Sequence, residues 1–469
     1  MDTLGVSPAQ FRELAGRTVD LLAHHLGELE TARSFPVTSG AETERLFCAP
    51  IPEEGMGAAA LDALSEVLRH SCPRSPRFFG YVLGAGDPVA ALGDLVASVL
   101  NQNVTAWRSS PAAVTIERSM VRWLAGALGE PGFSGSLTGG GSSANLMALA
   151  MARESRQPAN ESGARPGAIY ASTQVHMSIP KAVALLGLGR AHLRLIPVDA
   201  GFRMVPRALE QAIEEDRRAG RNQVAIVATA GTINTGAIDP LEEIGAIARR
   251  AGLWLHVDGA YGGLAALAVP EKFAGLTAAD SLSLDPHKWL SQPLDCGCLL
   301  YRDRTAAQNA LAYSGDYTRV LSEDPVEGFA FFEESIELSR RFRALKLWLS
   351  LRYHGAAAFR AAIRADLTHA RQLAKLVGEA PELELLAPVE LSAVCFRHRA
   401  GPGASEAEAN RFNAAILKKV IARGRVYFSN TTLDGRFALR ACFVNHRTEA
   451  ADVEAIVPEV LAAAHEVRG

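Results

Sequence analysis

One stretch of the chain guides the interpretation of the rest: Ser283-Leu284-Asp285-Pro286-His287-Lys288-Trp289. The residues that lead into it, Ala279–Leu284, resemble a short strand, so Lys288 is expected near the edge of a sheet. A lysine held there, beside a histidine and an aromatic ring, can bind a carbonyl cofactor as a Schiff base. The stretch is also compatible with an ordinary surface loop, because most lysines are solvated.

Upstream of this lysine, the apolar run Leu253–Asp258 reads as a strand that ends in an acid. A buried carboxylate needs a cationic partner, and a pyridinium nitrogen would provide one while staying protonated as an electron sink. The alternative is a strand-end acid that caps the next helix. Gly259 and Ala260 are small enough for a ring to lie against the backbone. Asp258 and Lys288 together indicate pyridoxal 5'-phosphate (PLP) as the cofactor.

A glycine-rich turn, Gly139–Gly141, leads into a predicted helix that continues through Leu146. Glycines let the backbone approach a phosphate, and the start of a helix supplies free N–H groups with partial positive charge. We therefore predict that Gly141 and Ser142 hold the phosphate. A glycine-rich turn alone is weak evidence, because it can simply be a tight loop.

Two further candidates follow predicted strands. His176 lies in the loop after Ala168–Ala171, and Thr229 comes at the end of Val224–Ala228. Ligands of open α/β folds bind at the carboxyl edge of the sheet, so His176 could stack on the cofactor ring and Thr229 could hydrogen-bond near it. A single loop histidine is more often a solvated side chain, so its value depends on the other motifs.

The fold class follows from short apolar runs that alternate with helical stretches after Pro111. This alternation predicts an α/β domain with a mainly parallel sheet. We expect an N-terminal helical segment over residues 1–85, which starts at Ser7-Pro8, a large cofactor-binding domain over 86–350, and a small C-terminal α+β domain over 351–469.

Composition excludes several classes of protein. The chain has 469 residues, with 48 Lys and Arg against 51 Asp and Glu, so nothing favours nucleic acid or anionic membranes as partners. It starts without a signal-like segment, and no apolar stretch approaches the roughly 20 residues that a membrane span needs, so we expect a cytoplasmic protein. Six cysteines are too few for a disulfide framework. Cys296 and Cys298 read as buried strand thiols, and we predict no metal site.

Taken together, these motifs resemble the group II PLP-dependent decarboxylases, the aromatic-L-amino-acid decarboxylase-like family of aspartate-aminotransferase fold (PLP fold type I). The resemblance covers nearly the whole chain and rests on Ser75–Tyr81, Ser110–Ala112, the glycine turn, His176, His256–Tyr261, Asp285–Trp289, Arg340–Lys346 and Leu439-Arg440.

The resemblance implies a role for each matching residue. Lys288 would form the Schiff base, Asp258 would pair with the ring nitrogen, His176 would stack on the ring, and His287 would lie near the phosphate. It also implies a homodimer in which both subunits build each active site and the N-terminal segment wraps around the partner.

The family carries a mobile loop after the lysine, with a tyrosine associated with protonating the decarboxylated carbanion. Tyr317 occupies that position here when the sequences are counted without gaps, and Tyr313 is the nearby competitor. A tyrosine there resembles members that form amines, whereas a phenylalanine is typical of relatives that release aldehydes.

The predicted substrate pocket departs from the family pattern. It includes Tyr81, Val82 and Thr105. Members that act on aromatic amino acids line the pocket with aromatic side chains near the positions of Pro73, Val82 and Thr105, none of which is aromatic here. The departure favours a non-aromatic or functionalised amino acid.

We therefore expect decarboxylation of an L-amino acid to CO2 and an amine. One alternative keeps the cofactor and couples decarboxylation to oxidative deamination, which gives an aldehyde, or performs β-elimination. A second alternative is a non-catalytic binding protein on the same fold. The presence of Lys288, Asp258 and His176 argues against that second alternative.

Overall fold

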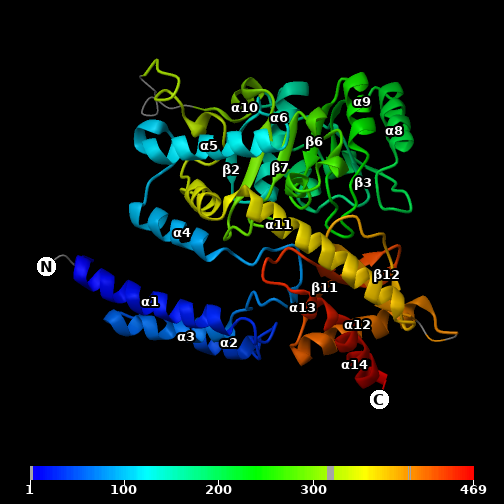
Figure 1. Cartoon of the computed structure of the whole chain (residues 1–469). Coiled ribbons are helices and arrows are strands. Elements are labelled where there is room, and N and C mark those ends of the chain that lie inside the picture. The colour runs from blue at the N-terminus through cyan, green and yellow to red at the C-terminus, as the bar shows by residue number, and fades with distance from the viewer. Residues whose placement is uncertain (1–3, 314–321, 400, 402, 469) are drawn as a thin grey trace.

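The computed structural model of the chain describes residues 4–313, 322–399, 401 and 403–468 (Figure 1). None of the helices in these ranges combines the length and the apolar character that a bilayer crossing requires.

A seven-stranded sheet forms the centre of the large domain, in the order β2-β8-β7-β6-β5-β3-β4. Only β8 runs antiparallel to both of its neighbours, and the remaining pairs are parallel. The near-continuous apolar runs of the sequence are typical of strands that are covered on both faces. The prediction of an α/β domain with a mainly parallel sheet is confirmed. The strands are β2 (Ser134–Thr138), β3 (Ala168–Ser172), β4 (Leu193–Ile196), β5 (Gln223–Thr229), β6 (Trp254–Asp258), β7 (Ser281–Leu284) and β8 (Gly297–Tyr301).

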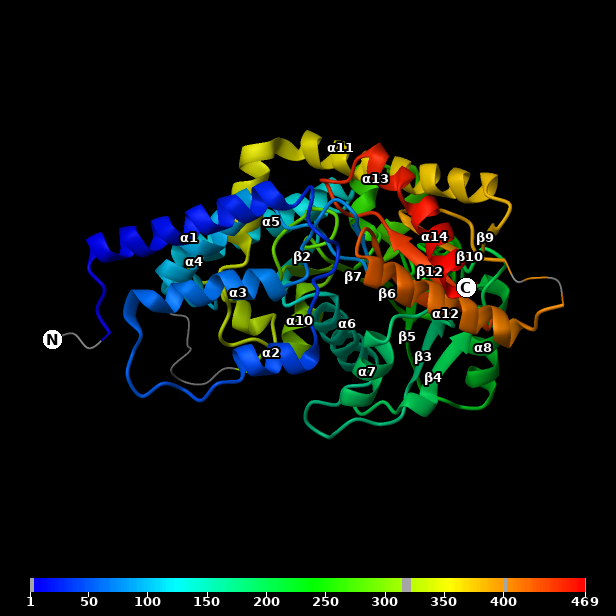
Figure 2. The same cartoon turned by 90° about the horizontal axis from the view of Figure 1, so that it is seen from below.

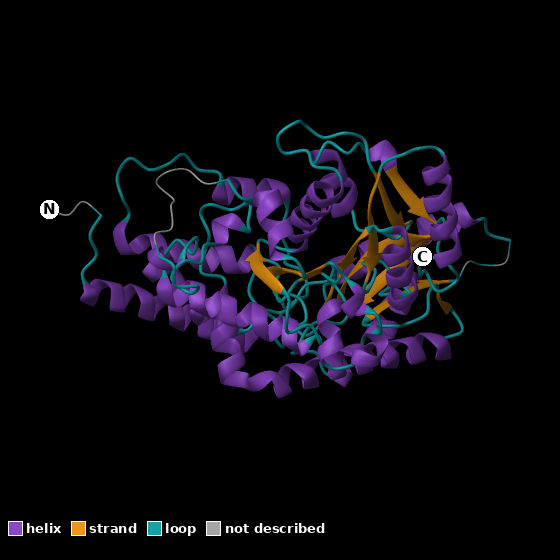
Figure 3. Ribbon diagram, turned by 90° about the horizontal axis from the view of Figure 1, so that it is seen from above, coloured by secondary structure: helices purple, strands orange, loops and turns teal. Residues whose placement is uncertain are grey.

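Helices cover both faces of this sheet (Figures 1 and 3). On one face, α5 (Pro111–Ala127), α8 (Pro206–Arg218) and α9 (Leu241–Ala251) pack over a core that includes Leu124, Leu209 and Ile244. On the other, α6 (Gly141–Arg156), α7 (Ser178–Leu185) and α10 (Arg304–Leu311) pack over Met147, Leu149 and Ile179. The two cores fix the sheet between them, so the strand ends are rigid attachment points.

The N-terminal segment begins with α1 (Pro8–Glu28), which starts where the sequence predicts. Ser7 Oγ accepts a hydrogen bond from the Gln10 backbone N–H, and Gln10 Oε1 accepts one from the Ser7 backbone N–H. α1 and α3 (Ala63–His70) lie alongside each other, to one side of the large sheet (Figures 1 and 2). α2 is Gly40–Phe47, and α1 buries none of its residues within one chain.

Two packed helices connect the parts of the chain. α4 (Pro88–Leu100) packs against the long helix α11 (Ala344–Glu379). α11 bends at Gly355, whose φ of 76° is accessible to glycine at little cost. It therefore starts against the large domain and ends against the C-terminal sheet (Figure 1).

The C-terminal domain is a five-stranded sheet in the order β1-β11-β12-β10-β9, with helices against it. β11 and β12 form a hairpin whose turn is Asp434-Gly435, where both residues have positive φ. β1, from the N-terminal segment, pairs in parallel with β11. The domain boundaries at 85/86 and 350/351 stay predictions. The elements are β1 (Phe78–Phe79), β9 (Leu383–Leu385), β10 (Ala393–His398), β11 (Tyr427–Leu433), β12 (Arg436–Cys442), α12 (Glu406–Arg423), α13 (Ala450–Glu454) and α14 (Ile456–Arg468).

Candidate active site

A cavity of about 260 Å³ lies where the carboxyl ends of β5, β6 and β7 meet the start of α6. Because parallel strands end at the same edge of a sheet, residues far apart in the sequence converge there. Eight residues that the sequence predicts for cofactor binding line this single cavity: Gly141, Ser142, His176, Thr229, Asp258, Ala260, His287 and Lys288.

Asp258 forms part of the cavity floor and is 5% exposed. Its Oδ1 accepts hydrogen bonds from the Ala260 backbone N–H and the Ser283 hydroxyl, both at 3.1 Å. Its Oδ2 accepts a hydrogen bond from Asn145 Nδ2 at 2.9 Å. These three donors stabilise a buried carboxylate that would otherwise be costly.

Lys288 reaches into the same cavity from the turn after β7. Its Nζ lies 2.9 Å from Asp285 Oδ2, and its side chain is 14% exposed. The other carboxylate oxygen of Asp285, Oδ1, is buried and has no hydrogen-bond partner among the described residues. The amine is therefore positioned by an acid within its own turn, beside a polar atom whose hydrogen bonding is incomplete.

The glycine turn forms the opposite side of the cavity. Helix α6, of 16 residues, begins at Gly141 without a side-chain cap. Its first backbone N–H groups therefore have no side-chain acceptor, and they lie at the cavity. A Cβ at Gly141 would lie 2.7 Å from the Ala260 Cβ and 3.1 Å from Asp285 Oδ2, so only glycine fits there. Exposed Ser142 lines the mouth of the cavity.

His287 lies next to this turn. Its Nδ1 is 2.8 Å from the Cys296 carbonyl oxygen, so Nδ1 carries a proton and donates it there. Burial lowers the pKa of His287 below its usual value, although nearby Asp285 acts in the opposite direction. A neutral imidazole therefore faces the glycine turn and leaves Nε2 for another partner.

His176 lines the cavity from the loop after β3, and its Nδ1 lies 2.8 Å from Ser178 Oγ. Burial lowers the pKa of His176, which Asp258 counteracts and Lys288 reinforces. Thr229 ends β5, and its backbone N–H donates to Asp239 Oδ2 at 2.8 Å. The Thr229 side chain is thereby held at the cavity edge.

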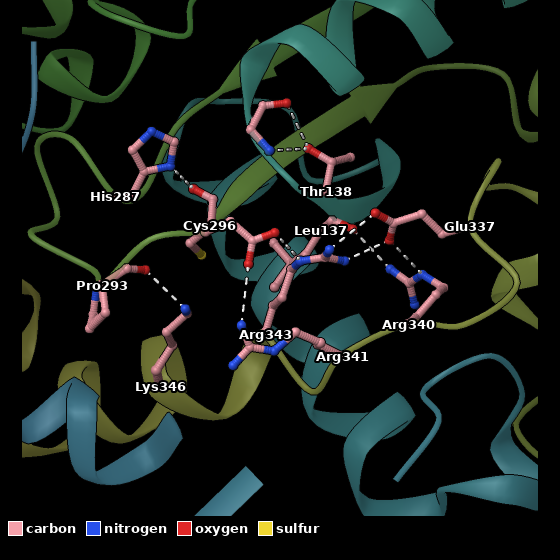
Figure 4. A network of polar contacts seen from close by, with 12 residues as sticks. Leu137, Thr138, His287, Pro293, Cys296, Glu337, Arg340, Arg341, Arg343 and Lys346 are labelled. Carbon is pink, nitrogen blue, oxygen red and sulfur yellow. Dashed lines mark hydrogen bonds and ion pairs between the residues drawn. The ribbon is translucent and has the colours of Figure 1, made fainter. Parts of the chain in front are cut away.

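Basic side chains at the start of α11 brace the loop that follows Lys288 (Figure 4). Lys346 Nζ donates to the Pro293 carbonyl oxygen at 2.9 Å. Arg343 Nε donates to Asp295 Oδ2 at 3.0 Å. Neither basic side chain belongs to the described lining of the cavity. The motif that contains them therefore supports the active-site loop from behind.

The residues present fit PLP. The open start of α6 and the glycine turn suit a phosphate. The carboxylate of Asp258, held as an acceptor at the floor, suits a protonated pyridine nitrogen, and Lys288 supplies a primary amine within the same cavity. Each chemical feature of the cofactor thus meets a matching group.

The predicted substrate wall lies elsewhere. In the described part of the chain, the cavity lining does not include Tyr81, Val82 or Thr105. Tyr81 is 56% exposed and its hydroxyl lies 3.0 Å from that of Tyr427, whereas Val82 is buried in the core. Tyr317 lies outside the described residues.

Four polar residues that organise the cavity were not singled out from the sequence: Asn145, Ser178, Ser283 and Asp285. Asn145, Ser283 and Asp285 stand within motifs that the sequence analysis quotes, and Ser178 follows His176 by two positions. These residues could have been found from the sequence, because a polar side chain on an otherwise apolar strand, or on the first turn of a buried helix, needs a hydrogen-bond partner.

Comparison with known proteins places this geometry in a family. Residues 60–399 match the model of the pyridoxal-dependent decarboxylase conserved domain. The chain is 34% identical to an aromatic-L-amino-acid decarboxylase of Bacillus atrophaeus, over 99% of this chain and 98% of the relative. It is 32% identical to a phenylacetaldehyde synthase of Petunia hybrida, over 93% and 90% of the two chains.

A solved structure agrees with these relatives. Oryza sativa TDC, determined with PLP and tryptamine, superimposes with a TM-score of 0.93 at 29% identity and covers 100% of both chains. The chain thus belongs to the pyridoxal-dependent decarboxylase family and is an amino-acid carboxy-lyase whose cofactor is pyridoxal 5'-phosphate.

Proposed function

We propose that Lys288, Asp258 and His176 are the catalytic residues of this decarboxylase, which converts an L-amino acid to CO2 and an amine. The observation that carries the proposal is the convergence of Lys288, Asp258 and the uncapped start of α6 on one cavity. A non-catalytic binding protein would not need a lysine amine opposite a buried, fully hydrogen-bonded carboxylate.

The roles follow from what each side chain can do. PLP, when bound, supplies a protonated pyridine ring that accepts the electrons of the breaking bond between Cα and the carboxylate. Asp258 keeps the ring nitrogen protonated, because its three hydrogen-bond donors hold it as a negatively charged acceptor. Lys288 is the amine that would hold the cofactor's carbonyl, and Asp285 orients it at 2.9 Å.

The phosphate and the ring would be held by residues of one chain. The backbone of Gly141 and Ser142 would bind the phosphate, and His287, fixed by its bond to the Cys296 carbonyl oxygen, would lie beside it. His176 would stack on the ring, while Thr229 and Ala260 border the ring's position. These groups bind and orient the cofactor before any substrate arrives.

Proton delivery is assigned to Tyr317. Its place in the sequence, after the lysine, supports this role, and it lies outside the described residues. A tyrosine hydroxyl can donate a proton to Cα once CO2 has left. Exclusion of water at that step would suppress side reactions.

The active enzyme is proposed to be a homodimer. α1 exposes Phe11, Val19, Leu22 and Leu26, each more than 40% exposed in a single chain. α4 exposes Leu92, Leu95 and Val99 as well. Apolar side chains gathered on two helices in this way mark an interaction surface, and a second copy that wraps around it would cover it.

The substrate is proposed to be an L-amino acid whose side chain is recognised near Tyr81 and Thr105, outside the described lining of the cofactor cavity. Relatives are named for aromatic substrates, for example tryptophan decarboxylase 1 of rice. Val82 and Thr105 offer no aromatic ring for stacking, which favours a non-aromatic or functionalised side chain.

A second candidate keeps the cofactor and releases an aldehyde with uptake of oxygen. The relative named phenylacetaldehyde synthase favours it. The tyrosine at position 317 favours the amine instead, because a phenylalanine is expected there in aldehyde-forming relatives.

The test follows CO2, oxygen uptake and product mass together, with the purified holoenzyme and a panel of aromatic, acidic and hydroxylated L-amino acids. Amine formation without oxygen uptake is expected. Tyr317→Phe is expected to shift the product towards aldehyde, whereas Tyr313→Phe, a matched change four residues away, leaves the amine. Aldehyde and ammonia from the unmodified enzyme would overturn the proposal.

A further inference from the structure

Beneath the cavity, a continuous chain of hydrogen bonds links the start of β6 to the start of α7. Trp254 Nε1 lies 2.9 Å from Ser281 Oγ, and Ser281 Oγ lies 2.9 Å from His256 Nδ1. His256 Nε2 in turn lies 2.9 Å from Asn145 Oδ1. Each of these four side chains is at most 5% exposed, so they satisfy one another rather than water.

The chain continues from Asn145 to the cavity. Asn145 Nδ2 lies 2.9 Å from Ser178 Oγ and 2.9 Å from Asp258 Oδ2. Ser178 Oγ lies 2.8 Å from His176 Nδ1. Asn145 is therefore the branch point that connects the floor carboxylate to the cavity histidine.

The direction of every bond can be fixed from the Asp258 end. A carboxylate only accepts hydrogen bonds, so the amide nitrogen of Asn145, rather than its oxygen, must face Asp258. The amide oxygen then faces His256 Nε2, which must carry the proton. Asn145 gives its second amide hydrogen to Ser178 Oγ.

The Trp254 end agrees with this direction. An indole N–H can only donate, so Ser281 Oγ accepts from Trp254 and keeps its own hydrogen for His256 Nδ1. A neutral His256 with its proton on Nε2 has Nδ1 as an acceptor, which matches this arrangement. Burial lowers the pKa of His256 to about 4, and it outweighs the opposing effects of Asp258 and the Ser281 backbone, so the ring is neutral.

The last link reaches the cavity. The Ser178 backbone N–H donates to His176 Nδ1 at 3.3 Å, and a backbone N–H can only donate, so Nδ1 is an acceptor. Ser178 Oγ accepts from Asn145 and therefore gives its own hydrogen to the same Nδ1. Two donors on Nδ1 leave no place for a proton there.

We propose that Asn145 is a positioning residue for the reaction: the one-way chain of hydrogen bonds through its amide holds His176 as the neutral tautomer with its proton on Nε2. His176 thereby presents one N–H donor to the bound group, which suits a carboxylate or phenolate oxygen, and it has no free nitrogen that could act as a base. This role rests on the proposed function for its place in the reaction.

The charged groups around His176 agree with a neutral ring. Asp258 and Asp285 favour its protonation, Lys288 and Lys181 oppose it, and burial lowers its pKa overall. A proton added to Nδ1 would also meet the two donors of Ser178. The hydrogen-bond chain and the burial therefore act in the same direction.

The test determines the protonated nitrogen directly. Holoenzyme with ¹⁵N-labelled histidine is examined by NMR correlations between ring nitrogens and ring C–H protons, and His176→Gln identifies the signal among the 12 histidines. We expect Nε2 to be protonated and Nδ1 not. Asn145→Asp retains the size but removes both amide donors, so Ser178 turns its hydrogen away and His176 shifts to an Nδ1-protonated form.

A matched control is Asn413→Asp, the same change at another fully buried asparagine, in α12. It is expected to cost stability to a similar degree and to leave the His176 tautomer unchanged. Ser178→Ala deletes only the last hydroxyl and is expected to raise the midpoint of His176 protonation and to lower kcat about tenfold. If Asn145→Asp does not fold, Ser178→Ala still tests the proposal.

Two results would overturn the inference: an Nδ1-protonated His176 in the unmodified holoenzyme, or an unchanged tautomer in Asn145→Asp together with an unchanged midpoint of His176 protonation in Ser178→Ala. The tautomer is measured without turnover, so its outcome is separate from the amino-acid panel. Decarboxylation without the Nε2 proton would refute the chain of hydrogen bonds alone, and an Nε2 proton without decarboxylation would refute the proposed function alone.

Discussion

The floor of the cavity and its outer wall are built very differently. On the floor, Asp258, Asn145 and His256 are at most 5% exposed, and each polar atom has a partner from the same chain. On the outer side, Leu294, which lines the cavity, is 60% exposed, and Tyr81, outside the described lining, is 56% exposed. One chain thus completes the floor, where we propose that the cofactor binds, and leaves the proposed substrate side open.

The difference has a physical reason. A charged ring nitrogen needs a preorganised partner in a place of low dielectric, so its supporting hydrogen bonds must be in position before binding. Substrate side chains are recognised by shape, which a partner subunit can supply. Changes on the floor should therefore affect the chemistry, and changes on the wall or the dimer surface should affect assembly and specificity.

The largest expected effect comes from the floor. Asp258→Asn removes the negative charge while keeping the size, and kcat should fall on the order of 10²–10³-fold because the ring nitrogen loses its counter-charge. Asp280→Asn is the matched control on the same sheet, since Asp280 accepts the Leu255 N–H outside the cavity at 2.8 Å. Steady-state kinetics of the two variant holoenzymes measure kcat. An equal fall in kcat in both variants would contradict the role given to Asp258.

An intermediate effect is expected from the dimer surface. Replacement of both Leu22 and Leu26 by Glu on α1 should weaken the dimer by about 3–4 kcal/mol, or two to three powers of ten in Kd. Asp20→Lys, on the opposite face of α1 by helical spacing, serves as the control. Analytical ultracentrifugation measures the dissociation constant of the dimer, and activity is assayed at the same protein concentrations. A double variant that stays dimeric and active would place the interface elsewhere.

The smallest effect concerns a buried carboxylate without the donors that Asp258 has. Burial raises the pKa of Asp366 to about 8, and the Asn445 backbone N–H opposes this only in part. The folded chain keeps a proton that the unfolded chain loses near its ordinary value of 3.8, so the free energy of unfolding falls as pH rises between about 4 and 8.

Asp366→Asn should remove most of this loss, so the variant's free energy of unfolding should change little between pH 5 and pH 8. Urea unfolding at both pH values and one protein concentration measures the change. Asp20→Asn, on exposed α1, is the control. If the variant and the unmodified chain show the same pH slope, Asp366 is ionised in the fold and the contrast with Asp258 fails.

Much of the fold could be predicted from the sequence, because buried parallel strands appear as short apolar runs between helices. The residues with distinctive chemistry, Lys288 and Asp258, could be found for the same reason: each is a charge next to an apolar run. The supporting hydrogen bonds could not. Asn145 and His256 are 111 positions apart, and only the folded sheet brings them together.

The segment Arg340–Lys346 illustrates another limit. Its resemblance to the family is visible in the sequence, but its role is not. Lys346 and Arg343, at the start of α11, hold the loop after Lys288 through Pro293 and Asp295, which stand 53 and 48 positions earlier in the sequence. Charge alone would have suggested a solvated helix start.

The central claim is that Lys288 holds the cofactor at the floor that Asp258 defines. The most direct measurement is borohydride reduction of the holoenzyme, followed by mass mapping of its peptides. The account predicts a pyridoxyl group on Lys288 and no visible cofactor absorbance in Lys288→Ala. A modified lysine elsewhere, with Lys288 unlabelled, would contradict it.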